Sequence, residues 1–388
     1  MIIQNLNMNH TVLGIDNIDK HINIFNGKRV GLVTNPTGIN ASFQSSIDIL
    51  KSKTNLVALF SPEHGVRANL QAGEHIGKYY DEIYDLLVYS LYGETRRPNE
   101  EMMSDIDILA IDIQDAGSRF YTFIYTMAYC MESCAKFNKE FVVFDRPNPI
   151  NGVDVEGNIL DLKYRSFIGY YPIVQRHGMT IAELAKMFNE EFGIGCKLHL
   201  ILMENWNRSY AFEETNLPWV IPSPNLPSIN TAFAYNATCI LEGTNVSEGR
   251  GTTVPFELFG APWIKPEALC EKLNSFQLPG VYFRPQYFVP TFSKHQGLMC
   301  GGVFMHVTNR ITFKPVKTGW MILDVIWKMY PTEFEVRAPY VKERPCMLEF
   351  NTGCDYIIGR TKSLEQQWRT LEEDSVKFIK LRSKYLLY

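Results

Sequence analysis

The segment from Arg29 to about Met203 alternates short apolar runs with longer amphipathic stretches, and this alternation constrains the fold more than any other feature. Short apolar runs bounded by turn residues are typical of buried strands, and the stretches between them are typical of helices. Such a chain pairs its strands in parallel and covers both faces of the sheet with helices. We therefore predict an α/β domain with a Rossmann-like, mostly parallel sheet. The predicted strands are 30–34, 57–60, 86–89, 108–113, 141–144 and 198–202, and the predicted helices are 42–51, 99–104, 121–137 and 181–192.

A proline-rich segment ends this pattern. Residues 218–227 hold four prolines, which a helix interior or a central strand does not tolerate. We place the domain junction here, with a catalytic domain over 1–230 and a smaller α+β domain over 231–388 that completes a cleft. In the second domain the predicted helices are 266–275, 316–329 and 363–380, and the predicted strands are 281–288 and 302–308.

Length, charge and cysteine usage limit the class of protein. A chain of 388 residues is long enough for two domains, and its net charge of −4 argues against a nucleic-acid partner. No apolar run reaches the length of a membrane span, and the first 17 residues lack the pattern of a signal peptide. The eight cysteines are scattered. We therefore expect reduced thiols and a cytoplasmic location.

Polar loops follow four of the predicted strands, at 35–38, 61–65, 112–118 and 145–149. The carboxyl ends of parallel strands meet at one edge of the sheet, where the ligand crevice lies in such folds. In the loop 61–65, Glu63 and His64 follow a proline directly, which places an ionisable pair at that edge. The alternative is structural, with Glu63 capping the next helix and His64 packing beside it.

A second dense motif covers 242–253, where three glycines surround Glu248 and Arg250. Glycine lets a ligand approach the backbone closely. The motif lacks the GK[ST] ending of a phosphate loop, and no G-x-G-x-x-G follows a strand, so a dinucleotide site is disfavoured. The alternative is an interdomain loop held by an Arg250 salt bridge. The arginines near the strand ends could bind an anionic group of the substrate. They are Arg67, Arg119, Arg146 and Arg250.

Glycoside hydrolysis usually needs two carboxyl groups that flank the scissile bond. The candidates are Glu63, Asp112, Asp115, Asp145 and Glu248. A competing pattern is the S-x-x-K, S-x-N and K-T-G triplet of penicillin-binding proteins, at Ser133, Ser223 and Lys317. Its context is unfavourable, because the first serine falls near the end of a predicted helix and K-T-G precedes a helix. The histidines show no metal-ligand spacing, so we assign no metal site.

Several long segments, in order, resemble the NamZ-type exo-β-N-acetylmuramidases, formerly the DUF1343 family. They are 27–37, 61–65, 112–121, 145–152, 222–227, 245–253, 288–290 and 294–297. The resemblance implies a Rossmann-like first domain, a smaller second domain and an active site between them. It also implies exo-acting removal of N-acetylmuramic acid from the non-reducing end of peptidoglycan fragments, without a cofactor.

The resemblance points to Glu63 as the catalytic residue, and a carboxylic acid there can protonate the glycosidic oxygen. His64 would orient it or bind a sugar hydroxyl, and Asp115 and Glu248 are candidates for the second carboxylate. Arg250 or Arg119 would recognise the lactyl carboxylate of muramic acid. Further substrate-binding candidates are Asn35, Arg67, Tyr121 and Asn225. The alternatives to a glycosidase are a non-catalytic muropeptide-binding protein and the serine acyl-transferase.

Overall fold

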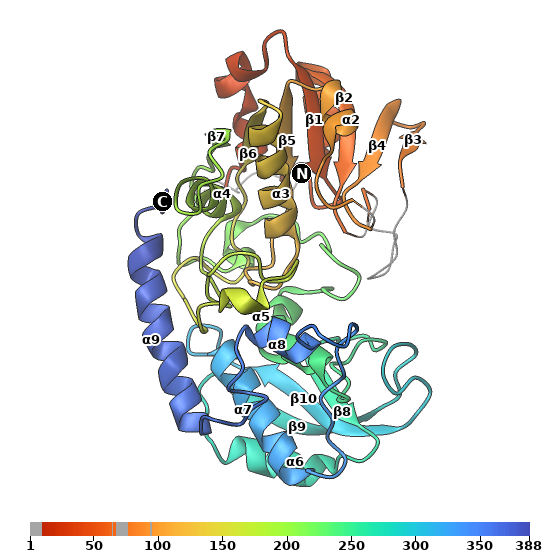
Figure 1. Ribbon diagram of the computed structural model, residues 1–388, viewed down its shortest axis with the longest axis vertical. Helices are drawn as coiled ribbons and strands as arrows, with labels where there is room; N and C mark the ends of the chain where they lie inside the picture. Colours follow the sequence, from red (N-terminus) through yellow and green to blue (C-terminus); the bar gives the residue numbers. More distant parts are fainter. Residues whose placement is uncertain (1–9, 64, 67–76, 94) are drawn as a thin grey trace, which may run out of the picture.

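The computed structural model describes residues 10–63, 65–66, 77–93 and 95–388, and it contains two sheets that lie in separate parts of the molecule (Figure 1). The larger sheet has seven strands in the order β3-β4-β2-β1-β5-β6-β7. All neighbours pair in parallel except β3, which runs antiparallel to β4 at the sheet edge. The strands are β1 (Arg29–Thr34), β2 (Asn55–Ser61), β3 (Tyr79–Asp81), β4 (Leu86–Ser90), β5 (Ile108–Asp112), β6 (Glu140–Phe144) and β7 (Lys197–Ile201).

Helices cover both faces of this sheet. Alternate side chains of each strand point to opposite faces, so Ile111 packs toward one core cluster and Ala110 toward the other. The first cluster includes α3 (Phe123–Lys136) and α4 (Ile181–Glu190), and the second includes the 3₁₀ helix η1 (Gly14–Phe25) and α1 (Ser46–Lys53). A short helix, α2 (Glu100–Ser104), precedes β5.

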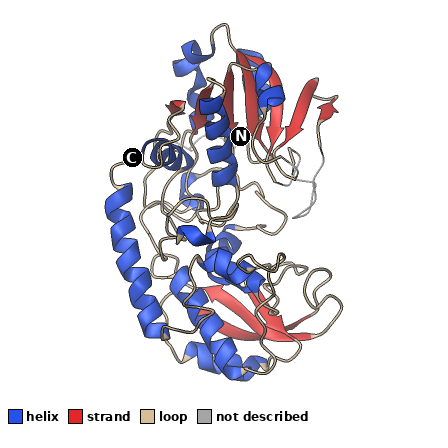
Figure 2. Cartoon of the chain, in the orientation of Figure 1, coloured by secondary structure: helices blue, strands red, loops and turns tan. Residues whose placement is uncertain are grey.

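The second sheet is small and fully antiparallel, in the order β8-β10-β9. Its strands are β8 (Leu258–Ala261), β9 (Val281–Phe288) and β10 (Cys300–Val307). Three helices pack around it or on one another: α5 (Ile229–Thr238), α6 (Pro266–Asn274) and α7 (Pro315–Met329). A short helix, α8 (Met347–Thr352), lies near the middle of the molecule (Figure 1). Figure 2 shows that loops make up most of the region between the two sheets.

The last helix, α9 (Leu364–Arg382), connects the two parts by running along one side of the molecule (Figure 1). Arg382 near its end donates to the carbonyl oxygen of Gly152 at 2.9 Å. The Tyr388 hydroxyl donates to Asp145 at 2.6 Å, beside the larger sheet. The end of the chain therefore packs on the first part of the protein, although the segment before it belongs to the second.

The observed architecture confirms the predicted fold class, and each predicted strand and helix is present with small shifts at its ends. The predicted helix 42–51 begins later, at Ser46. There the Ser45 Oγ accepts a hydrogen bond from the Asp48 N–H at 3.0 Å, which caps the first turn. Among the described residues no helix is both long and apolar enough to cross a membrane.

Candidate active site

Glu63 lies two residues beyond the end of β2, at the carboxyl edge of the parallel sheet. Its side chain is half-buried, and its Oε2 accepts a hydrogen bond from the Thr122 hydroxyl at 2.8 Å. Thr122 directly precedes α3, so the helix start positions this donor. The neighbouring His64 and the candidate Arg67 lie outside the described residues.

Glu63 faces a small cavity of about 60 Å³ whose wall is mostly aromatic. The rings are those of Phe120, Tyr121, Phe123, Tyr235 and Phe256. Within the described part of the chain, no cation forms an ion pair with Glu63. The cavity wall also includes Arg250, so Glu63 shares this cavity with one cation and several aromatic rings.

Glu248 is almost fully buried, on the loop before β8, and is held between two cations. Its Oε2 lies 2.8 Å from Lys294 Nζ, and its Oε1 lies 3.2 Å from Arg250 Nε. Burial raises the pKa of the Glu248 carboxyl, but the two cations outweigh burial and hold the pKa below its usual value. Glu248 is therefore ionised at neutral pH.

Arg250 connects the surroundings of the two carboxylates. It lines the cavity that Glu63 faces and also an adjoining cavity of about 650 Å³ that Glu248 lines. Its guanidinium pairs with Glu242, with Nε 3.1 Å from Oε1, and lies 5.1 Å from the centre of the Phe256 ring. Arg250 thus pairs with Glu248 from the second part of the chain and shares a cavity with Glu63 from the first.

The glycines beside Arg250 serve the protein's own backbone rather than a ligand. Gly249 and Gly251 have φ of +81° and +83°, which other residues rarely adopt. A Cβ at Gly249 would lie 2.3 Å from the Leu258 carbonyl oxygen, and one at Gly251 would lie 2.5 Å from that of Phe292. We had expected these glycines to leave room for substrate, and the crowding shows that neighbouring segments fill that space.

Asp115 is buried and is not among the described residues that line either of these two cavities. Its Oδ2 accepts from the Gly117 N–H at 2.7 Å and lies 3.3 Å from His177 Nε2. The Met179 N–H donates to His177 Nδ1 at 3.2 Å, so a neutral His177 carries its proton on Nε2, toward Asp115. Burial raises the pKa of Tyr121 well above its usual value, and the Asp115 and Glu63 carboxylates raise it further. Tyr121 thus lies within the electrostatic reach of both carboxylates.

Arg119 occupies a structural position. It is fully buried, and its guanidinium donates to the carbonyl oxygens of Asn158 and Ile173 and to two carbonyls at the end of α8. Arg119 is not among the described residues that line the cavities of Glu63 and Glu248. The position does not support the expected role of Arg119 in binding a substrate carboxylate.

The remaining binding candidates, Asn225 and Asn35, differ in whether they line one of the two cavities. Asn225 is buried and lines the cavity of about 650 Å³ with Glu248. Asn35 is buried after β1, where its Oδ1 accepts from the Thr37 N–H at 3.0 Å. Asn35 therefore holds the turn at the strand end, and it lines neither cavity.

Two further carboxylates that we considered for catalysis are held by other parts of the protein. Asp112 forms a buried ion pair with Arg146, with Oδ2 2.8 Å from Nη2. Asp145 accepts from the Ala182 N–H at the start of α4 at 2.9 Å, and burial raises its pKa to about 7. Asp112, Asp145 and Arg146 therefore stabilise the sheet edge instead of lining the cavities around Arg250.

The arrangement also argues against a serine acyl-transferase. Ser133 lies in the last turn of α3 in the upper part of Figure 1, whereas Lys317 lies in α7 in the lower part. Lys317 is helical, and its Nζ pairs with Glu372 at 3.4 Å. Of the three motif positions, Ser223 alone lines the cavity that Glu63 faces.

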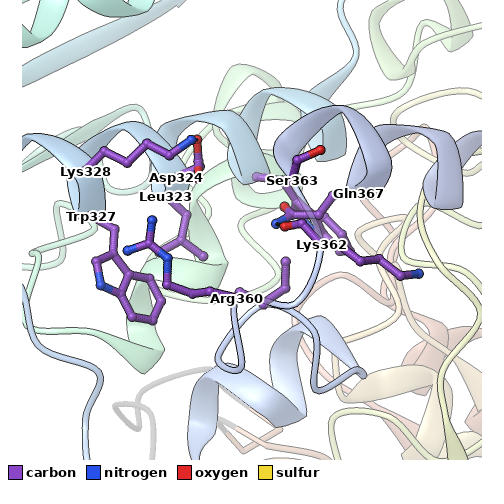
Figure 3. A pocket seen from close by; sticks show the side chains of 10 residues that line it. Leu323, Asp324, Trp327, Lys328, Arg360, Lys362, Ser363 and Gln367 are labelled. Carbon is purple, nitrogen blue, oxygen red and sulfur yellow. Dashed lines mark hydrogen bonds and ion pairs between the residues drawn. The ribbon is translucent and has the colours of Figure 1, made fainter.

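Another cavity, of about 300 Å³, lies between α7 and the start of α9, and Figure 3 shows its side chains. Its one carboxylate, Asp324, pairs with Lys328 at 2.7 Å, and Arg360 lies 5.1 Å from the centre of the Trp327 ring. None of the residues predicted from the sequence lines it. In the described ranges we find no group of three or more histidine, cysteine, aspartate or glutamate residues placed to hold a metal.

Sequence reasoning missed several residues around Arg250. Thr122, Glu242 and Lys294 were given no role. Lys294 lies in the segment 294–297 that carries part of the family resemblance, which was the one available signal. The partners of Thr122 and Lys294 are far away in sequence, whereas Glu242 lies eight residues from Arg250, within the same motif.

Comparisons with known proteins identify the family. Residues 30–230 match the sequence model described as exo-β-N-acetylmuramidase NamZ, N-terminal, and residues 233–388 match its C-terminal counterpart. The chain is 50% identical over 364 residues to the peptidoglycan β-N-acetylmuramidase NamZ of Bacillus subtilis strain 168, covering 93% of this chain and 87% of that protein.

Two crystal structures of DUF1343 family proteins from Bacteroides fragilis NCTC 9343 share the fold. The first has a TM-score of 0.89 at 37% identity and covers 98% of this chain and 99% of its own. The second has a TM-score of 0.75 at 31% identity and covers 97% and 99%. The agreement extends over both sheets and the loops that carry Glu63 and Glu248, so the chain belongs to the NamZ family of exo-β-N-acetylmuramidases.

Proposed function

We propose that this chain is an exo-acting glycoside hydrolase that releases N-acetylmuramic acid from the non-reducing end of peptidoglycan fragments. The observation that carries the proposal is that Glu63 and Glu248 line two cavities that share Arg250 in their walls. The resemblance to the Bacillus subtilis enzyme supports the choice of substrate.

The two carboxyl groups suit different steps. Glu63 faces aromatic rings and is the proposed acid, which gives its proton to the glycosidic oxygen as the sugar leaves. Glu248 stays ionised between Lys294 and Arg250, so it is the proposed second carboxylate and would stabilise the positive charge that develops on the sugar ring. Asp115 is buried and would act on the site through its electrostatic effect on Tyr121.

Further parts of the proposal rest on the sequence. His64 would orient Glu63 or bind a sugar hydroxyl, Arg67 would bind substrate, and the domain division at 230/231 follows the proline-rich segment. All eight cysteines are unpaired and buried, which is compatible with a reducing compartment, and we propose the cytoplasm.

The proposal is tested by incubating the purified protein with the disaccharide of N-acetylmuramic acid β-linked to N-acetylglucosamine, and with longer peptidoglycan glycans. We expect free N-acetylmuramic acid to accumulate from the first minutes, with each glycan shortened by one residue at a time. Release of internal fragments would contradict exo action. Tight binding without any product would favour the alternative, a muropeptide-binding protein.

A further inference from the structure

The cavity of about 650 Å³ beside Glu248 has three cations in its wall: Arg250, Lys294 and Arg337. The N-acetylmuramic acid residue of the proposed substrate carries a carboxylate on its lactyl group. A planar guanidinium binds such a group through two parallel hydrogen bonds. The cation best suited to bind the lactyl carboxylate is one whose charge the protein's own carboxylates do not already balance.

Arg250 and Lys294 are both committed to the protein. Arg250 pairs with Glu242 and Glu248 through Nε and Nη2, so two carboxylates already balance its charge. Lys294 Nζ donates to the carbonyl oxygens of Leu241 at 2.7 Å and Val246 at 2.8 Å, and it lies 2.8 Å from Glu248. Two of the three N–H donors of Lys294 therefore serve backbone carbonyls, and its charge is balanced by Glu248.

Arg337 differs from both. Its side chain is exposed and forms no hydrogen bond or ion pair with any residue that the structure describes. The described lining residues of this cavity include two carboxylates, Glu242 and Glu248, against three cations. Arg337 is therefore the cation left over once those two carboxylates are neutralised.

The backbone of Arg337 is anchored, although its side chain is free. Its N–H donates to the Gly243 carbonyl oxygen at 2.9 Å, next to Glu242 in the sequence. The Asn245 side chain fixes the same segment, with Nδ2 2.7 Å from the Glu333 carbonyl oxygen and Oδ1 3.0 Å from the Glu335 nitrogen. An anchored backbone keeps the guanidinium at the cavity wall, which reduces the entropy lost on binding.

We propose that Arg337 binds the lactyl carboxylate and is the residue by which the enzyme distinguishes muramic acid from glucosamine. This inference rests on the proposed function and replaces Arg250 and Arg119, the candidates taken from the sequence. Tyr340 and Phe292, both exposed on the same cavity, supply apolar surface against which the sugar would pack.

The test compares Arg337→Ala and Arg337→Lys with the wild type on a chromogenic β-N-acetylmuramide and on the same compound with its lactyl group as a methyl ester. For the wild type we expect kcat/KM on the acid to exceed that on the ester by about 10-fold to 100-fold. In Arg337→Ala this ratio falls to near one, through loss of activity on the acid, and Arg337→Lys retains part of it. Arg344→Ala is the matched control, because Arg344 is also exposed but does not line the cavity.

The two proposals fail in different ways. If the wild type hydrolyses neither compound nor the natural disaccharide, the proposed function fails and the role of Arg337 fails with it. If the wild type prefers the acid and Arg337→Ala keeps that preference within twofold, the muramidase proposal stands and the assignment of Arg337 is overturned.

Discussion

Replacing Arg119 by methionine tests whether this residue is structural, as its contacts indicate, or binds substrate, as we expected from the sequence. The guanidinium donates at 2.7 and 3.0 Å to the carbonyl oxygens of Asn158 and Ile173, and at 3.2 and 3.0 Å to those of Asn351 and Thr352. The last two belong to the end of α8, where a helix leaves carbonyls without partners and favours a cation.

Methionine fills similar space but donates no hydrogen bond, so Arg119→Met leaves these buried carbonyls short of donors. A hydrogen bond to a charged group contributes about 1.5–3 kcal/mol to stability. Removing the buried cation also removes its desolvation cost, which offsets part of the loss. We expect a net loss of about 3–5 kcal/mol in the free energy of unfolding. If all 388 residues unfold together, the melting temperature falls by about 4–6 °C.

The assay combines thermal and urea unfolding with kinetics well below the melting temperature. We expect a less stable protein whose ratio of kcat/KM for a β-N-acetylmuramide over the matching glucosaminide is unchanged. Arg29→Met is the control, because Arg29 forms a partly exposed ion pair with Asp107, and we expect its loss to change stability little. Wild-type stability together with a collapsed ratio would refute the structural interpretation of Arg119.

Two further predictions concern stability. Gly249→Ala adds a Cβ 2.3 Å from the Leu258 carbonyl oxygen at a φ of +81°, so we expect it to lose about 2–4 kcal/mol of unfolding free energy, as measured in urea. Gly27→Ala is the control, because Gly27 has a φ of +70° and no atom lies within 4 Å of the added Cβ. We expect it to lose only the energy of the unfavourable backbone conformation, about 1–2 kcal/mol. Equal losses in the two variants would contradict a contribution from the clash. Burial raises the pKa of Glu140, but two lysines and a histidine outweigh it and lower the pKa to about 2. Its ion pairs therefore stabilise the fold above the unfolded pKa of 4.5, and this contribution disappears as the pH falls toward 2. Glu140→Gln should be less stable than wild type by about 1–2 kcal/mol at pH 7, and urea titrations from pH 7 to 2 should show the difference vanish, whereas a constant difference would contradict the electrostatic cause.

Much of the fold was predictable because strands buried on both faces appear in the sequence as nearly continuous apolar runs. The elements that were missed lack such a signal. β3 has three residues and β8 has four, including a glycine, so neither shows a pattern. α5 is buried on nearly all sides and therefore has no amphipathic period for sequence analysis to detect.

The candidate site was predictable in its parts but not in its arrangement. Glu63 stood out because it follows a strand at a proline, and Glu248 because it lies among glycines. The salt bridge of Arg250 within its own loop was one of the two alternatives taken from the sequence, but its sharing of a cavity with Glu63 depends on long-range packing that no local pattern encodes. Arg119 shows the same limit, since its four partners lie 39 to 233 positions away in the sequence.

The central claim, that Glu63 is the acid, is tested most directly by the kinetics of Glu63→Gln on two substrates. The amide keeps the size of the side chain but cannot give up a proton. On the muramic acid–glucosamine disaccharide, whose leaving group needs protonation, we expect kcat to fall by about 100-fold to 10,000-fold. On an aryl muramide with a strongly activated leaving group the loss should be much smaller, with unfolding unchanged. Near wild-type activity on the disaccharide, or equal losses on both substrates, would contradict the assignment.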